Sequence, residues 1–300
     1  DVTNYSQTYS LCGHENHMSP DDHYQDLKRI IAAVGGKARR ITVIMPFLYE
    51  SRQHKRTARE SLDCALALQE LVKMGVDNII TFDAHDPRVQ NAIPLTGFEN
   101  VHATYQMIKA CLRYDDKIIL NKDNTMIISP DEGAVGRCIY YSSVLGMDLG
   151  MFYKRRDYAT VVDGKNPIVA HEFLGSDLAG KDVIVVDDMI ASGDSMIDVA
   201  KELKKRKARR VLVFSTFGLF TEGVDKFNQA YESGLIDAVF TTNLVYRMPE
   251  LLRAPWYHEV DMSKYIALII KTLNDDNSIS ELLTPISRIE KILNKYRGQA

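Results

Sequence analysis

The chain has 300 residues, of which 45% are apolar and 26% charged, and its formal net charge at pH 7 is −3. This is the composition of a globular protein with room for one large domain or two of moderate size. A slightly acidic chain has no general attraction to nucleic acids or acidic membranes. The apolar stretches are too short to span a bilayer and the start has no signal-peptide pattern, so we expect no nucleic-acid and no membrane partner.

The cysteines are widely spaced and form no C-x-x-C pair; they are Cys12, Cys64, Cys111 and Cys138. In a chain of this size they are typical of free thiols in a reducing compartment, which indicates a cytoplasmic protein. The chain begins at Asp1 rather than at a methionine and has no hydrophobic lead. We therefore expect a further segment upstream.

Short apolar runs alternate with amphipathic patterns along the chain. The runs are typical of strands buried on both faces and lie at 41–47, 78–83, 125–131, 150–153, 183–188, 211–217, 238–242 and 256–260. Helical patterns lie at 22–34, 57–74, 101–114, 134–145, 195–207, 223–233, 263–273 and 280–296. This alternation predicts an α/β fold with mainly parallel sheets flanked by helices.

The alternation runs through two units. We predict an N-terminal domain at 1–97, a C-terminal domain at 98–263, and helices at 264–300 that pack back on the N-terminal domain. Both units place polar and acidic residues just after a strand, where ligands bind in open α/β sheets.

A basic loop follows the first predicted strand and contains Arg52, Gln53 and Lys55, with Tyr49 nearby. Arg and Lys can meet phosphate oxygens, and Gln can read the edge of an adenine. The loop can therefore hold a nucleotide. A solvated basic turn before the next helix is the alternative, and composition alone favours it.

Two further loops carry candidate metal ligands. His85 lies between Asp83 and Asp86 after the second predicted strand, and a histidine among acids can bind a divalent cation or carry a proton. A lone histidine at such a place is usually structural, so both readings stay open. Asp131 follows the third strand, where Mg²⁺ could bridge it to phosphates, or where a Ser-Pro-Asp turn has no chemistry.

Three cations, Lys154, Arg155 and Arg156, follow the predicted strand at 150–153. At the end of a strand they can offset charge that builds up on a transferring phosphoryl group. A charge cluster that faces water is the commoner outcome.

The run from Lys181 to Met196 contains the most informative pattern. A buried strand ends in Asp187 and Asp188, a loop of small residues follows at 191–195, and a helix then begins. Such a junction points backbone N–H groups and the positive end of a helix dipole at one spot, which suits a phosphate. The acid pair suits sugar hydroxyls or a bridging cation. The pattern therefore favours a sugar-phosphate site over an ordinary βα turn.

This run resembles the phosphoribosyl-pyrophosphate (PRPP) loop of type I phosphoribosyltransferases and of PRPP synthases. Taken in order, five segments together resemble the ribose-phosphate pyrophosphokinase (PRPP synthase) family; they lie at 52–55, 83–85, 129–133, 154–156 and 186–190. The resemblance implies two tandem type I phosphoribosyltransferase-like domains. It also implies transfer of the diphosphoryl group of ATP to the 1-hydroxyl of ribose 5-phosphate, which gives PRPP and AMP.

The resemblance also implies roles for single residues. ATP would be held by Arg52, Gln53, Lys55 and His85. Mg²⁺ would be held by His85 and Asp131. The residues at the reacting group would be Lys154, Arg156 and His85. Ribose 5-phosphate would be held by Asp187, Asp188, Ser192, Gly193, Asp194 and Ser195. The stretch 157–168 would be a flap that closes over ATP and excludes water.

The chain departs from the family pattern in its PRPP loop. Ala191 replaces an acid that would contact the ribose, and Asp194 replaces a glycine, so its charge has to point away from a bound phosphate. Residues 132–134 replace paired glycines. The family's opening strands, whose acidic and aromatic loop completes a neighbour's ATP site, have no counterpart before Asp1.

Two other functions stay open from the sequence. A phosphoribosyltransferase that consumes PRPP is favoured by Ala191 and disfavoured by the two fused domains. A non-catalytic regulatory subunit of a PRPP synthase is favoured by the altered loop and disfavoured by the presence of His85, Asp131 and Lys154. By resemblance we expect a homo-oligomer, a hexamer built from dimers.

Overall fold

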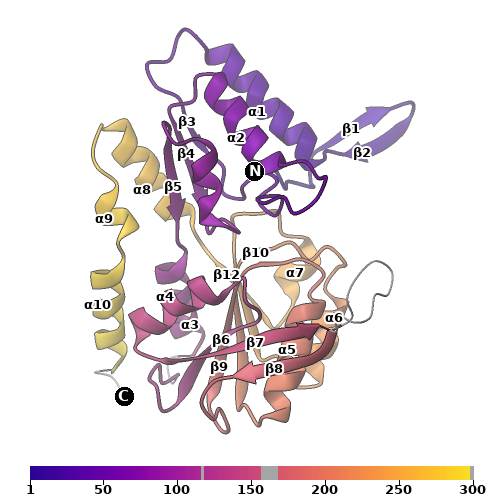
Figure 1. The fold of residues 1–300 in the computed structure, drawn as a ribbon, viewed down its shortest axis with the longest axis vertical. Helices are drawn as coiled ribbons and strands as arrows, with labels where there is room; N and C mark the ends of the chain where they lie inside the picture. Colours follow the sequence, from indigo (N-terminus) through magenta and orange to yellow (C-terminus); the bar gives the residue numbers. More distant parts are fainter. Residues whose placement is uncertain (116–117, 157–167, 298–300) are drawn as a thin grey trace. The chain divides into compact units, whose positions relative to one another are not determined.

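The computed structural model describes residues 1–115, 118–156 and 168–297. The chain divides into two compact units (Figure 1). The first comprises residues 1–103 and 243–247, and the second residues 104–242 and 248–300. No helix within the described ranges is both long and apolar enough to cross a membrane.

The first unit is built on a small parallel sheet in the order β3 (Thr42–Ile44), β4 (Asn78–Phe82), β5 (Gly97–Val101). Its helices are α1 (Pro20–Val34), α2 (Asp63–Lys73) and the 3-10 helix η1 (Pro87–Ala92), and an antiparallel hairpin of β1 (Thr8–Leu11) and β2 (His14–His17) precedes them. Helix α1 begins at a capping box in which Ser19 and Asp22 satisfy each other's backbone N–H groups. Apolar residues of α1, α2 and β4 form one core, which includes Ile31, Leu68 and Ile79.

The second unit contains, among the described residues, a seven-stranded sheet in the order β12-β11-β10-β9-β6-β7-β8. In chain order the strands are β6 (Thr125–Ser129), β7 (Asp148–Arg156), β8 (Ile168–Leu174), β9 (Asp182–Ile190), β10 (Arg210–Gly218), β11 (Ala238–Thr242) and β12 (Tyr257–Val260). Neighbouring strands are parallel except for β7 and β8, which are antiparallel.

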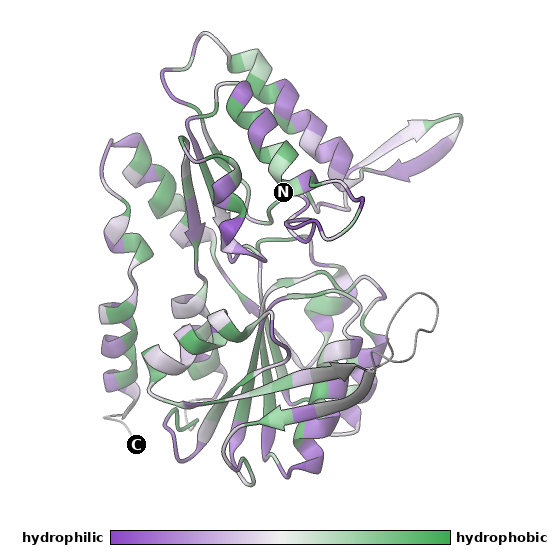
Figure 2. Ribbon diagram, in the orientation of Figure 1, coloured by the Kyte–Doolittle hydropathy of each residue, from purple (hydrophilic) through white to green (hydrophobic). Residues whose placement is uncertain are grey.

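The helices of this unit are α3 (Thr104–Tyr114), α4 (Val135–Leu145), α5 (Asp194–Lys205), α6 (Asp225–Glu232), α7 (Pro249–Arg253), α8 (Ser263–Asn274), α9 (Ser280–Leu283) and α10 (Ile286–Arg297). The middle of each central strand is apolar, as the green colour in Figure 2 shows. Side chains on both faces are buried because helices connect and cover parallel strands, so these strands form continuous apolar runs rather than alternating ones. This core fixes the strand ends from which the candidate site is built.

The predicted α/β fold with mainly parallel sheets is confirmed. Strands β1, β2 and β5 were not predicted by the apolar pattern, because each has at most five residues and few buried side chains. Strand β8 was not predicted either. The helix expected at 280–296 is instead two helices, α9 and α10. They are separated at Pro285, which has no backbone N–H to continue a helix.

The division between the units lies after Ala103. Strand β5 pairs with β4 and therefore extends the first unit beyond Gly97, where the alternation predicted its end. Helix α10 contacts α3 within the second unit. The predicted packing of residues 264–300 on the N-terminal domain stays a prediction.

Candidate functional site

The sheet of the second unit has a topological switch point between β6 and β9. The chain leaves β6 through α4 to reach β7 on one side, and it leaves β9 through α5 to reach β10 on the other. Ligands bind in open α/β sheets at the carboxyl ends of the two strands where the direction reverses. The register pairs Ile128 with Val185, so the segment after β6 lies beside Asp187 and Asp188.

The acid pair, Asp187 and Asp188, lies at this edge, and its surroundings shift the pKa of Asp187. Asp188 is buried, and its backbone N–H donates to Asp187 Oδ1 at 2.9 Å. Burial, followed by the charge of Asp188, raises the pKa of Asp187 well above its ordinary value, while Arg137 acts in the opposite direction. The Arg137 guanidinium lies 3.8 Å from Asp188 Oδ1. Donors such as sugar hydroxyls, or a cation, would relieve this crowding of negative charge.

Asp131 lies on the neighbouring segment and organises the start of α4. Its Oδ1 accepts from the backbone N–H groups of Gly133, at 2.9 Å, and of Ala134, at 3.2 Å. Its charge is also one of those that raise the pKa of Asp187, which places the two carboxylates near each other. One oxygen of Asp131 is thus a structural acceptor at a helix start, in an oxygen-rich corner of the site.

Cys138 packs beneath this corner and ties the two strands together. Its thiol donates to the carbonyl oxygens of Ile128, at 3.6 Å, and of Val186, at 3.3 Å. Burial is the main cause that raises the pKa of the thiol to about 12. The cysteine is therefore a neutral structural donor under the acid pair.

The small-residue loop after β9 turns sharply into α5. Gly193 has φ +87, and a Cβ there would lie 2.3 Å from Cε2 of Phe227, so only glycine fits both the backbone and the space. Helix α5 begins at the next residue, Asp194, and its first N–H groups have no partners within the helix. The predicted tight loop that leads into a helix start is present, but α5 begins at Asp194, so the loop ends at Gly193 rather than at Ser195.

Lys154 and Arg156 lie on the last part of β7, whose backbone pairs Lys154 with His171 of β8. The predicted flap at 157–168 lies outside the described residues except for Ile168, the first residue of β8.

In the first unit, His85 lies beside a second histidine, His54. Their ring centroids are 5.2 Å apart, and His54 Nε2 is 3.4 Å from Asp86 Oδ2. Side-chain hydrogen bonds from Arg88 lower the pKa of Asp86 to about 2, so this carboxylate is ionised. The sequence indicated His54 only as part of the basic loop, whereas the structure places it in a half-buried cluster with His85 and Asp86.

The basic loop is only partly available to a ligand. Gln53 Nε2 donates to Glu60 Oε2 at 3.1 Å and to the carbonyl oxygen of Ser61 at 2.8 Å. Arg52 and Lys55 are exposed. The amide of Gln53 would have to leave Glu60 to read an adenine edge.

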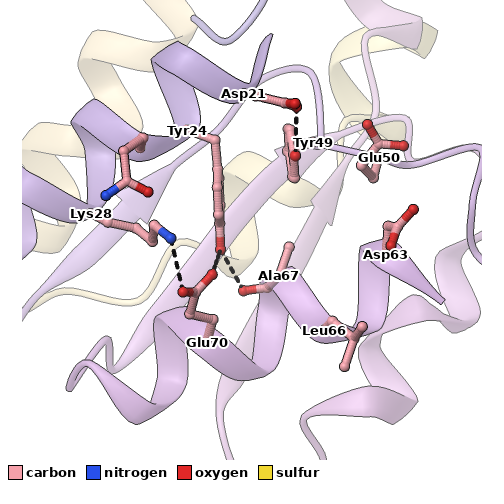
Figure 3. Close-up of a pocket in the computed structure, with 10 residues that line it drawn as sticks. Asp21, Tyr24, Lys28, Tyr49, Glu50, Asp63, Leu66, Ala67 and Glu70 are labelled. Atoms are coloured by element: carbon pink, nitrogen blue, oxygen red, sulfur yellow. Dashed lines mark hydrogen bonds and ion pairs between the residues drawn. The ribbon is translucent and has the colours of Figure 1, made fainter. Parts of the chain in front are cut away.

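A hollow of about 590 Å³ also lies in the first unit, between α1 and α2 (Figure 3). Tyr24 and Tyr49 stack along it with ring centroids 4.3 Å apart. The other polar groups that line the hollow are mainly acids, among them Asp21, Glu50 and Asp63. Burial of Glu50, followed by the negative charges of Asp63 and Asp21, raises the pKa of Glu50. Because carboxylates repel a polyphosphate, this hollow is unsuited to a nucleotide, and it does not include Arg52, Gln53 or Lys55.

Within the described ranges, no group of three or more His, Cys, Asp or Glu side chains could hold a metal ion by itself. Mg²⁺ usually takes one or two carboxylates and completes its shell with waters and substrate phosphates. The oxygens of Asp131, Asp187 and Asp188 are ligands of the kind that Mg²⁺ prefers, so this edge fits the ion.

Comparisons with known proteins give three family matches. The family described as "N-terminal domain of ribose phosphate pyrophosphokinase" matches residues 7–75. The "Phosphoribosyl transferase domain" matches residues 97–220, and the "Phosphoribosyl synthetase-associated domain" residues 159–284.

Two curated relatives illustrate the similarity over most of the chain. A ribose-phosphate pyrophosphokinase of Pasteurella multocida is 30% identical over 250 residues, which cover 82% of this chain and 74% of that protein. A protein of the same name from Mycoplasma pneumoniae is 28% identical over 251 residues, which cover 83% and 72%.

Among solved structures, phosphoribosylpyrophosphate synthetase from Mycobacterium smegmatis has a TM-score of 0.74 at 19% identity and covers 90% of both chains. This likeness supports the α/β fold class.

Proposed function

The chain belongs to the ribose-phosphate pyrophosphokinase family, and from this premise we propose that it converts ATP and ribose 5-phosphate into PRPP and AMP. The oxygen of the ribose 1-hydroxyl forms a bond to the β-phosphorus of ATP, while the bond from that phosphorus to the α,β-bridging oxygen breaks. The β,γ-diphosphoryl group moves to the sugar, AMP leaves, and the hydroxyl proton is released. The product serves nucleotide biosynthesis.

The observation that carries the proposal is the pairing of an acid pair with a helix start at the β6/β9 switch point. Residues 192–195 comprise the end of the loop and the first residues of α5, and the N–H groups of this helix start suit the 5-phosphate. Asp187 and Asp188 are crowded acceptors that suit the ribose hydroxyls. We propose that ribose 5-phosphate binds here through Asp187, Asp188 and the loop.

The nucleotide side of the reaction rests on the resemblance. We propose that Arg52, Gln53, Lys55 and His85 hold ATP. Lys154 and Arg156, on β7 next to β6, would stabilise the transferred group. Such a transfer depends mainly on positioning and on neutralising charge, so cations on the strand next to the sugar site are chemically appropriate.

We propose that Mg²⁺ is used, with His85 and Asp131 as its protein ligands. When bound, the ion neutralises the phosphate oxygens and makes the β-phosphorus more electrophilic. Asp131 suits this role because carboxylate oxygen is the usual protein ligand of Mg²⁺. Imidazole is a less common ligand of Mg²⁺, and a titration of His85→Ala with Mg²⁺ tests this role.

The other functions considered from the sequence are not favoured. The named relatives are pyrophosphokinases, and the similarity covers both halves of the chain rather than a single phosphoribosyltransferase domain. We propose in addition a homo-oligomer, a hexamer built from dimers, which light scattering on the purified chain would measure.

One assay tests the activity. The chain is incubated with ATP, Mg²⁺ and ribose 5-phosphate, and AMP and PRPP are quantified by chromatography. Equal amounts of both products are expected. Turnover only with PRPP and a nucleobase would instead identify a phosphoribosyltransferase, and no turnover in either assay would identify a non-catalytic subunit.

A further inference from the structure

The loop proposed to hold the 5-phosphate carries a negative charge of its own. Asp194 is the first residue of α5, and its Oδ2 accepts a hydrogen bond from Ser192 Oγ at 3.0 Å. This carboxylate lies at the positive N-terminal end of the α5 dipole, which favours anions. There it competes with a bound phosphate both for the favourable electrostatic interaction with the helix dipole and for the hydrogen bond from the Ser192 hydroxyl. A loop of this kind needs a counter-charge to accept a phosphate dianion.

The counter-charge is Lys226, which is distant in the sequence. Its ammonium group lies 2.6 Å from Asp194 Oδ1 and 2.6 Å from Glu222 Oε2. The hydrogen bond from Lys226, followed by that from Ser192, lowers the pKa of Asp194. Asp194 is therefore ionised at neutral pH and bound to a cation outside the loop.

The protein core fixes the position of Lys226. The next residue, Phe227, is buried; its ring lies against Gly193 and packs with Phe220 and Trp256 at centroid distances of 5.1 and 5.3 Å. The contact with Gly193 joins the start of α6 to the loop. Because Phe227 is fixed in this way, the backbone of Lys226 stays within reach of Asp194, and the ammonium group is positioned by its ion pairs with Asp194 and Glu222.

We propose that Lys226 is a positioning residue for ribose 5-phosphate: it holds the Asp194 carboxylate toward α6 and screens its charge, so that the loop can accept the phosphate. The inference rests on the proposed function, because it takes the 5-phosphate to occupy the loop 192–195. It explains how a loop with an acid in place of a glycine can still bind an anion. It assigns Lys226 no contact with the reacting atoms.

The test is a double-mutant cycle on the full chain with two readouts. Ribose 5-phosphate binding is measured by calorimetry without ATP, and KM and kcat are measured in the complete assay. The variants are Lys226→Gln, Asp194→Asn and the double variant, with Lys226→Arg as the conservative replacement. Lys205→Gln is the matched control, since Lys205 is an exposed lysine paired with Glu202 in the last turn of the same α5.

We expect Lys226→Gln to weaken ribose 5-phosphate binding and to raise its KM about three- to fivefold, the upper range for couplings of exposed charge pairs. The KM for ATP and kcat should change little, and Lys226→Arg should restore the affinity. With Asp194→Asn already present, Lys226→Gln should have almost no further effect, because there is no charge left to screen. Lys205→Gln should match the wild type.

Two results would overturn the inference. One is an unchanged affinity in Lys226→Gln; the other is a loss of the same size whether or not Asp194 is charged. The two readouts separate this inference from the proposed reaction. Binding that depends on Lys226 in a chain without turnover would support the inference and contradict the reaction, whereas turnover that ignores Lys226 would do the opposite.

Discussion

Arg209 donates two hydrogen bonds to the fully buried carboxylate of Asp182, from Nε to Oδ1 and from Nη2 to Oδ2, each 2.7 Å long. Arg210 donates to the same two oxygens. Asp182 is the first residue of β9, so this ion-pair cluster lies at the end of the strand opposite the acid pair. It anchors the strand that carries the site without belonging to the site.

Asp182→Asn should therefore destabilise the protein and leave ligand affinity unchanged. The Asp182 carboxylate is fully buried, but the Arg209 and Arg210 side chains are 52% and 26% exposed, so water can solvate them and we expect a loss of about 1–3 kcal/mol. Urea unfolding would measure the loss of stability, and calorimetry on the folded protein would measure ribose 5-phosphate binding. A stable variant with weakened binding would contradict this separation of roles.

Asp187→Asn should change how stability depends on pH. The pKa of Asp187 is raised in the folded state, so the folded chain binds more protons than the unfolded chain between the ordinary carboxyl pKa and the raised one. The free energy of unfolding should therefore fall as pH rises through this window, by on the order of 1 kcal/mol for each pH step inside it. Urea unfolding between pH 4 and pH 7, a range of about the ordinary carboxyl pKa to neutrality, should show a flatter profile for Asp187→Asn. If the free energy of unfolding depends on pH in the same way in the wild type and in Asp187→Asn, then the pKa of Asp187 is not raised in the folded state.

Gly193→Ala should disrupt the loop through both its backbone and its packing. The methyl group would meet the ring of Phe227, and the positive φ adds strain, so we expect a loss of about 1–3 kcal/mol together with weaker ribose 5-phosphate binding. Gly180→Ala is the matched control: Gly180 has φ +76, and a Cβ there would meet nothing within 4 Å. The difference in melting temperature between the two variants isolates the contact with Phe227. Equal decreases in melting temperature for Gly193→Ala and Gly180→Ala would show that the contact between residue 193 and Phe227 does not contribute to stability.

His85→Ala and Lys154→Ala should each reduce PRPP formation by about a hundredfold or more while the chain stays folded. Circular dichroism would check the fold, and the AMP assay the turnover. For His85→Ala, a titration with Mg²⁺ tests the ligand role, since loss of a metal ligand raises the concentration of ion needed for half-maximal activity. Near-normal rates in both variants would remove these assignments.

The central strands were predictable from the sequence because burial on both faces makes them continuous apolar runs. The predicted strand at 238–242 matches β11 residue for residue. Strand β5 was missed because its two large apolar residues, Phe98 and Val101, are three positions apart and so neither alternate with polar residues nor form a continuous run. What determines such a strand is its partner, β4, and pairing of this kind is not visible in local sequence.

The same distinction applies to the site. The acid pair and the loop 191–195 are local features, so the sequence revealed them directly. Lys226 was not predicted because it lies 32 residues from Asp194, and only the packing of Phe227 against Gly193 brings the two together. Arg137 and His54 were missed for the same reason: each gains its partner from another segment through tertiary structure.

The order of strands in the second sheet has a consequence for synthesis on the ribosome. Strand β6 lies between β7 and β9, but β9 emerges only after β7 and β8 are complete. Until then, one side of β6 is an open edge of unpaired N–H and C=O groups in an apolar segment, which is a template for pairing with other chains. A nascent chain that pauses before residue 182 would therefore expose this edge, and the arrival of β9 both protects it and brings the acid pair beside the segment that follows β6.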